Sequence, residues 1–263
     1  MRLGFRRGSP PLDPEPPAAT SGTAVDGLKS WTAVYGAAAT FLIPGLVVGL
    51  VCGALIGGIG GRLAMFVLRV TSDDSLHGLQ TDDDFTIGKF TGDTLSLLLI
   101  TAVLGAVGAL VYLGVREWLP QRGRPLLFGL LGATVGGSIF IRPGGIDFTR
   151  LAPLEMAVAF FVVLPAAYGV SLSVLTERLV RSTGWRRSRW RWVAILPFGL
   201  LVVTGPFGLG VLLLVGLVVA ANRSGGVDRL WHSAPVTWLG RGAVATAIGG
   251  GGVLLARDIM AVL

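Results

Sequence analysis

The chain has 263 residues, of which 52% are hydrophobic and only 14% are charged, with a formal net charge of +7. Soluble domains carry about a quarter charged residues, so this composition excludes an ordinary soluble globular protein. The positive charges lie mainly in short segments beside long apolar runs, where they set membrane orientation, and this distribution argues against nucleic-acid binding. The sequence predicts an all-α, polytopic transmembrane helical bundle in the plasma membrane.

Residues 1–32 contain three arginines and five prolines but few large apolar side chains. This composition is typical of a disordered tail, which we expect in the cytoplasm. No apolar core follows the basic start before Trp31, so a cleavable signal peptide is not expected. The transmembrane helical domain is predicted to occupy residues 33–263.

The first predicted span, about 36–58, continues to residue 70 as a helix at the interface. It carries a ladder of glycines with a spacing of four residues: Gly45, Gly49, Gly53, Gly57 and Gly61. Residues four apart share one helix face, and a face without side chains lets another helix approach closely. The ladder predicts a central packing helix, which could also join homo- or hetero-oligomers.

Further apolar runs predict the remaining spans, at about 95–115, 125–141, 154–176, 193–221 and 238–260. The run 193–221 is interrupted by Pro197 and Pro206, so it forms either one kinked span or two short spans in a hairpin. A hairpin places more basic residues inside, but each half is shorter than the usual 20 or so residues. We take six spans as the count, with seven as the alternative.

The distribution of lysine and arginine predicts that the N-terminus is cytoplasmic. On this orientation the loop after the first span faces outward and gathers six aspartates: Asp73, Asp74, Asp82, Asp83, Asp84 and Asp93. Carboxylate oxygens suit calcium or magnesium, but the spacing is not that of an EF-hand loop. A solvated acidic loop is the simpler interpretation, and we assign no metal site.

The tripeptide Asp84-Phe85-Thr86 recurs as Asp147-Phe148-Thr149, each a few residues before an even-numbered span. One interpretation is helix capping by Asp147 or Thr149. The other is that two duplicated hairpins bring their outer loops to one site, as in repeat-built transporters. We therefore choose Asp83, Asp84 and Asp147 as candidate binding residues.

Arg62 is the fourth candidate binding residue, because it lies at the edge of the glycine ladder, where a charge is costly unless paired. It could reach lipid headgroups, pair with a loop aspartate or bind an anionic substrate. A second basic stretch, Arg178–Trp192, interleaves arginine with tryptophan and is predicted to contact anionic lipid at the cytoplasmic face.

Catalytic signatures are absent from the sequence. The two histidines, His77 and His232, fall on different loops, and Cys52 lies in an apolar span without a nearby base. No phosphate-binding glycine loop follows a strand. We therefore predict no catalytic residue, cofactor or metal, and lean against an enzyme.

Three stretches resemble a family of multi-pass actinobacterial membrane proteins: Gly60–Met65, Thr81–Thr91 and Asp147-Phe148-Thr149. The resemblance covers roughly residues 45–180 and implies a membrane fold but no mechanism. From the residues, the favoured function is handling of a small ion, solute or lipid through the outer acidic region. The alternative is a non-catalytic partner or scaffold of an envelope complex, docked through the glycine-ladder helix.

Overall fold

The computed structural model describes residues 42–71, 92–142, 144, 153–181 and 226–263, with isolated positions between 199 and 220. These residues form helices and include no strand. Four helices are long and apolar enough to cross a membrane: Leu42–Leu68, Leu95–Val115, Leu154–Arg181 and Ala234–Val262. The prediction of an all-helical membrane protein is confirmed at this level.

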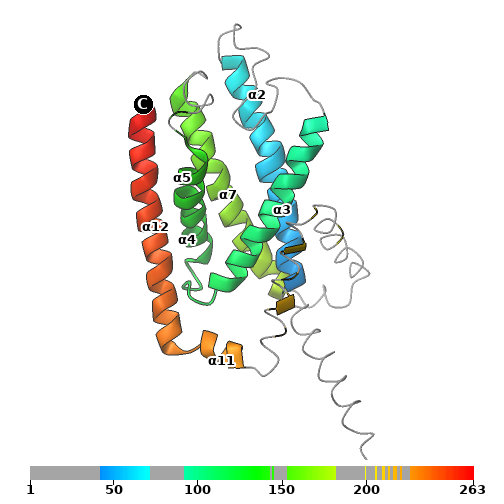
Figure 1. Ribbon diagram of the computed structural model, residues 1–263, viewed down its shortest axis with the longest axis vertical. Helices are drawn as coiled ribbons and strands as arrows, with labels where there is room; N and C mark the ends of the chain where they lie inside the picture. Colours follow the sequence, from blue (N-terminus) through cyan, green and yellow to red (C-terminus); the bar gives the residue numbers. More distant parts are fainter. Residues whose placement is uncertain are drawn as a thin grey trace, which may run out of the picture.

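Neighbouring helices of the bundle run up and down beside one another (Figure 1). Residues 42–52 are α-helical and continue into the π-helix η1 (Gly53–Gly60) and then α2 (Gly61–Thr71). The other elements are α3 (Gly92–Val115), α4 (Arg124–Leu131), the π-helix η3 (Gly132–Gly136), α5 (Gly137–Phe140), α7 (Leu154–Arg181), α11 (Gly226–Trp231) and α12 (Ala234–Val262).

The predicted spans can be located on these elements. The predicted second span, 95–115, has the bounds of the apolar part of α3, and the predicted last span, 238–260, lies inside α12. The third, 125–141, corresponds to a shorter apolar helix, Arg124–Phe140, in which α4, η3 and α5 follow one another. The run 193–221 and the tail 1–32 lie outside the described residues.

The helix 42–68 packs against α3 through direct backbone contact. A methyl group added at Gly49 would meet the carbonyl oxygen of Gly105, and one added at Gly53 would meet the carbonyl oxygen of Thr101. Gly45 faces Leu113 Cδ1, 2.7 Å from the position of such a methyl group. The two helices approach this closely because no side chain separates their backbones.

A second hairpin, formed by α4–η3 and α7, packs in the same way. A methyl group added at Gly169 of α7 would lie 2.6 Å from the carbonyl oxygen of Phe128. One added at Gly132 would meet the carbonyl oxygen of Pro165. Both hairpins therefore join a glycine-rich helix that contains a π-helical segment to an uninterrupted α-helix.

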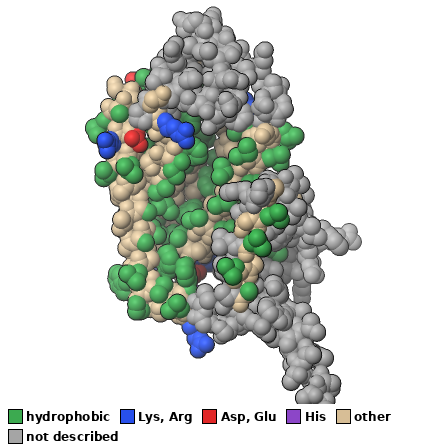
Figure 2. Space-filling view, viewed as in Figure 1, with side chains coloured by type: hydrophobic (Ala, Val, Ile, Leu, Met, Phe, Trp, Pro, Cys, Tyr) green, Lys and Arg blue, Asp and Glu red, His purple; other side chains and the backbone are tan. Residues whose placement is uncertain are grey.

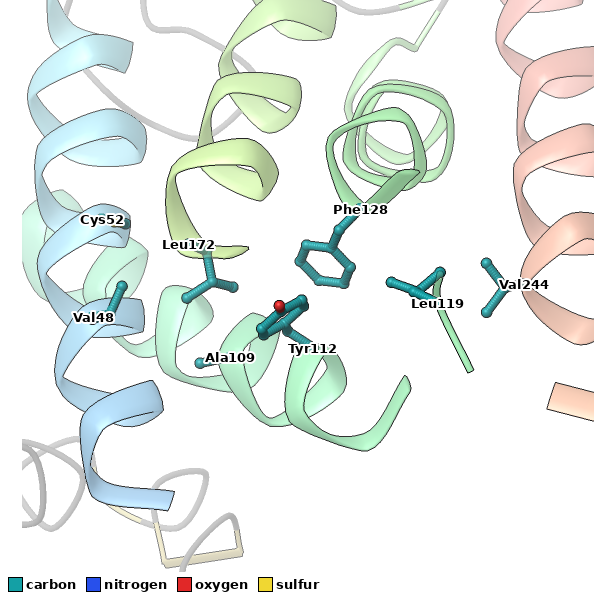
Figure 3. Packing of buried hydrophobic residues seen from close by; sticks show 8 residues of the cluster. All are labelled: Val48, Cys52, Ala109, Tyr112, Leu119, Phe128, Leu172 and Val244. Carbon is teal, nitrogen blue, oxygen red and sulfur yellow. The ribbon is translucent and has the colours of Figure 1, made fainter. Parts of the chain in front are cut away.

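The hydrophobic core lies where the two hairpins and α12 meet (Figure 3). The ring of Tyr112 from α3 meets Phe128 from α4 edge to face, with centroids 4.9 Å apart. The core residues come from the first span, α3, the turn after it, α4, α7 and α12: Val48, Cys52, Ala109, Tyr112, Leu119, Phe128, Leu172 and Val244.

Many large apolar side chains also face outward (Figure 2). Leu63, Leu126 and Val253 are at least 60% exposed although they belong to helices of the bundle. Such an apolar exterior is unfavourable in water and suits lipid chains. The surface therefore fits a bilayer environment.

The segment between α7 and α11 starts and ends at one end of the bundle. The last turn of α7 contacts Arg116 and Arg124, which flank the turn between α3 and α4. From α11, Trp231 stacks on Trp118 of the same turn and donates a hydrogen bond to the Gly114 carbonyl.

Candidate functional site

Of the four predicted binding residues, the structure describes one. Asp83, Asp84 and Asp147 lie outside the described residues, so the meeting of the outer loops stays a prediction. Arg62 lies in the first turn of α2, and its Nε and Nη2 atoms are shielded by the protein. Arg62 is therefore the one candidate of the four whose surroundings the described residues define.

The ladder glycines differ among themselves in what they contact. Gly45, Gly49, Gly53 and Gly57 lie against α3, where Gly57 faces the Thr101 Cβ. Gly61, the last of the ladder, has nothing within 4 Å of an added Cβ. The four that contact α3 thus do so within the same chain.

A cluster of charged side chains lies at the end of the bundle where α3, α4 and α7 meet. Its centre is Glu177, one turn before the end of α7. Tyr112 and Arg116 are four residues apart on and just after α3, which places both on the face toward α7. Arg124 is the first residue of α4 and is held by a hydrogen bond from its Nε to the Leu119 carbonyl.

Three donors converge on one oxygen of Glu177. The Tyr112 hydroxyl donates to Oε1 at 3.0 Å, and Arg124 Nη1 donates to it at 3.2 Å. Arg116 Nε lies 3.3 Å from the same oxygen. The other oxygen, Oε2, lies 3.5 Å from Arg181 Nη2, one turn along α7. The Glu177 carboxylate thus ties α7 to both α3 and α4.

A second carboxylate, Glu117, supports the same guanidinium groups. It lies 3.3 Å from Arg116 Nε and 3.7 Å from Arg124 Nη2. Arg116 and Arg124 are only 7% and 5% exposed. Removal of two guanidinium groups from water is costly unless carboxylates and hydrogen bonds compensate them, which explains why two carboxylates are present.

Polar groups continue from this cluster toward the middle of the bundle. The fully buried Ser173 donates a hydrogen bond to the Tyr112 hydroxyl at 3.0 Å. Thr176, also fully buried, lies on the same helix. Deeper in the bundle, the Tyr168 hydroxyl donates to the Gly105 carbonyl at 2.6 Å. Much of the buried polarity of the two hairpins therefore lies along the seam between α3 and α7.

Tryptophans surround the same end of the bundle. Trp118 and Trp231 stack with ring centroids 4.7 Å apart, and Arg241 of α12 donates to the Trp118 carbonyl at 3.1 Å. The Arg241 guanidinium also lies 5.3 Å from the centre of the Trp238 ring. Tryptophan is enriched at membrane interfaces, so its presence here is what we expect of the end of a membrane-spanning bundle.

Sequence reasoning missed this site. It interpreted Arg116 and Arg124 as orientation signals and gave Glu177 no role. One signal was available: Glu177 is a carboxylate that directly follows an uncharged run, 156–176, and lies four residues after Ser173. Among the described residues, no group of three His, Cys, Asp or Glu side chains could hold a metal ion.

Comparisons with known proteins do not assign the chain to a family. The chain matches no family model, no curated protein and no solved structure.

Proposed function

We propose that this membrane protein handles a small ion, solute or lipid, and that the Glu177 cluster is part of the machinery. The observation that supports the proposal is the convergence of Tyr112, Arg116 and Arg124 on one buried carboxylate oxygen. Arg116 and Arg124 are removed from water although they lie at the end of the bundle, and burial of charged groups is costly, so a role in binding is a reason to retain them.

The proposed topology has seven spans, with a cytoplasmic N-terminus in the plasma membrane. Seven is the alternative to the six spans favoured by the sequence, and its support is that Arg181 and Trp231 lie at the same end of the bundle, as a hairpin between α7 and α11 requires. The Glu177 cluster is then at the cytoplasmic face, and the aspartates Asp83, Asp84 and Asp147 are at the outer face. Arg62 lies on the helix that leads to the outer loop.

A flux assay tests the proposed function. Purified protein is reconstituted into liposomes, and the movement of sodium, potassium, chloride, phosphate and a fluorescent lipid is compared with empty liposomes. We expect flux of one of these species, and a change of about tenfold or more on Glu177→Gln or Asp84→Asn. Glu155→Gln, an exposed carboxylate on the same helix, is the matched control. Wild-type flux equal to that of empty liposomes for all five species would contradict the proposal.

The second candidate function is a non-catalytic partner in an envelope complex, and α12 supports it. Gly242, Gly249 and Gly250 are exposed and have nothing within 4 Å of an added Cβ. The ladder glycines of the first span, by contrast, contact α3 of the same chain. We therefore place the proposed docking face on α12 instead of on the ladder.

Co-purification distinguishes this alternative. Gly249→Leu should release a bound partner or a second copy without lowering the melting temperature of the protein. Gly251→Leu, two residues along, is the contrast, because an added Cβ there would lie 3.1 Å from Val135 Cγ2 within the bundle. Identical co-purified material from wild type and Gly249→Leu would count against docking through α12.

A further inference from the structure

The Glu177 carboxylate is surrounded by Arg116, Arg124 and Arg181. We propose that these three arginines bind a phosphate-bearing anion, which displaces the carboxylate from them. The inference rests on the proposed function, because it names the chemical class of ligand at the same cluster. Phosphate is the chemistry shared by a lipid headgroup and by free inorganic phosphate.

The geometry of the ion pairs supports exchange. Arg116 Nε and Arg124 Nη1 approach the same oxygen of Glu177, Oε1, so the two guanidinium groups share one acceptor. The separations, 3.3 and 3.2 Å, exceed the 2.7–2.9 Å or so typical of charge-assisted hydrogen bonds. A tetrahedral phosphate presents oxygens in several directions, so it can contact guanidinium groups that approach from α3, α4 and α7 together.

An approach to the site exists at its rim. The Arg181 side chain is 73% exposed while it contacts Glu177 Oε2, whereas the Glu177 side chain itself is 14% exposed. An anion can therefore meet Arg181 first and then displace the carboxylate from the two buried arginines. The stacked Trp118 and Trp231 place this rim at the level where lipid phosphates lie.

If the anion displaces the carboxylate, removal of the Glu177 charge should strengthen phosphate binding. If Glu177 has only a structural role, the same change should not strengthen it. Glu177→Gln keeps the shape of the side chain but removes the charge that competes with the anion. The variant should be less stable without ligand, because two buried guanidinium groups lose one counter-charge. It should bind phosphate about tenfold more tightly, and added phosphate should restore its melting temperature.

The experiment measures binding of inorganic phosphate to the full chain by titration calorimetry in neutral phosphatidylcholine nanodiscs. In parallel, melting temperatures are recorded in discs with increasing phosphatidylglycerol. Arg181→Gln should weaken binding about tenfold, and its exposed position leaves the buried pairs intact if Glu177→Gln fails to fold. Arg257→Gln, an exposed arginine near the opposite end of α12, is the control.

Three outcomes are informative. Phosphate binding in neutral discs that Arg181→Gln weakens supports a site for free phosphate, and tighter binding in a folded Glu177→Gln shows that the phosphate competes with the carboxylate. A response to phosphatidylglycerol alone that Arg181→Gln reduces supports a lipid headgroup site. Binding that is unchanged by Arg181→Gln, or absent with both probes, overturns the proposal. The flux assay is a separate measurement, so a protein that binds phosphate without transport would refute the proposed function alone.

Discussion

The middle of the bundle and its Glu177 end are held together by opposite means. In the middle, the backbones of the first span and α3 touch at Gly49 and Gly105, with no side chain between them. At the Glu177 end, long side chains reach across from three helices and meet at one carboxylate oxygen. The glycine contact requires that no side chain lies between the two backbones. The Glu177 cluster requires opposite charges.

This difference teaches how each region should respond to change. A backbone contact tolerates no added volume but is indifferent to charge, because van der Waals packing drives it. An ionic cluster tolerates a change of shape better than the loss of one partner, which leaves a buried charge uncompensated. Four predictions can break or sharpen the comparison.

Loss of the central carboxylate should have the largest effect. Glu177→Ala leaves Arg116 and Arg124 buried with Glu117 as their remaining counter-charge in the described structure, at a cost of about 3–5 kcal/mol of unfolding free energy. Unfolding in detergent followed by circular dichroism measures it. Glu155→Ala at the other end of α7 should cost little, and equal losses in the two variants would show that the cluster is not stabilising.

Added volume in the glycine contact should have the next largest effect. Gly53→Leu forces a side chain into the Thr101 carbonyl and should cost about 1–3 kcal/mol or more. Gly61→Leu on the same helix is the control, because nothing lies within 4 Å of that position. Melting temperatures in one detergent compare the two, and similar values would refute a packing role for the ladder.

The two buried tyrosines separate charge from packing. Tyr112→Phe removes a hydrogen bond to the Glu177 carboxylate, worth about 1.5–3 kcal/mol, and Tyr168→Phe removes one to the Gly105 carbonyl, worth about 1 kcal/mol. Urea or denaturing-detergent titration should rank Tyr112→Phe as the more destabilised. The reverse ranking would mean that the hydroxyl of Tyr112 gains little from the charge of Glu177.

Small substitutions on α12 should have the smallest effect. Gly249→Ala adds a methyl group in open space. Because alanine favours the helix more than glycine does, the variant should be more stable by up to about 1 kcal/mol. Gly251→Ala places the same group 3.1 Å from the backbone of Thr134, which should offset that gain. Thermal melting of both variants checks the sign, and a destabilised Gly249→Ala would indicate that the outer face of α12 is covered.

The sequence by itself determined the class of the protein and showed that glycines form a packing face on its first helix. Long uncharged runs can only be helices in a bilayer, because lipid offers no partner for backbone hydrogen bonds. Glycines four residues apart must share a helix face, so a smooth face on the first span followed from spacing alone. These inferences depend only on residues that are close together in the sequence, so they can be made without the tertiary structure.

Only the tertiary structure decided which surfaces meet. Gly45, Gly49, Gly53 and Gly57 contact α3, whereas nothing lies within 4 Å of a Cβ added at Gly61. The Glu177 cluster joins residues from positions 112 to 181. No local sequence pattern predicts that the ends of α3, α4 and α7 meet. Long-range pairing depends on how whole helices pack, so arginines that look like orientation signals in the sequence are buried partners of a carboxylate in the fold.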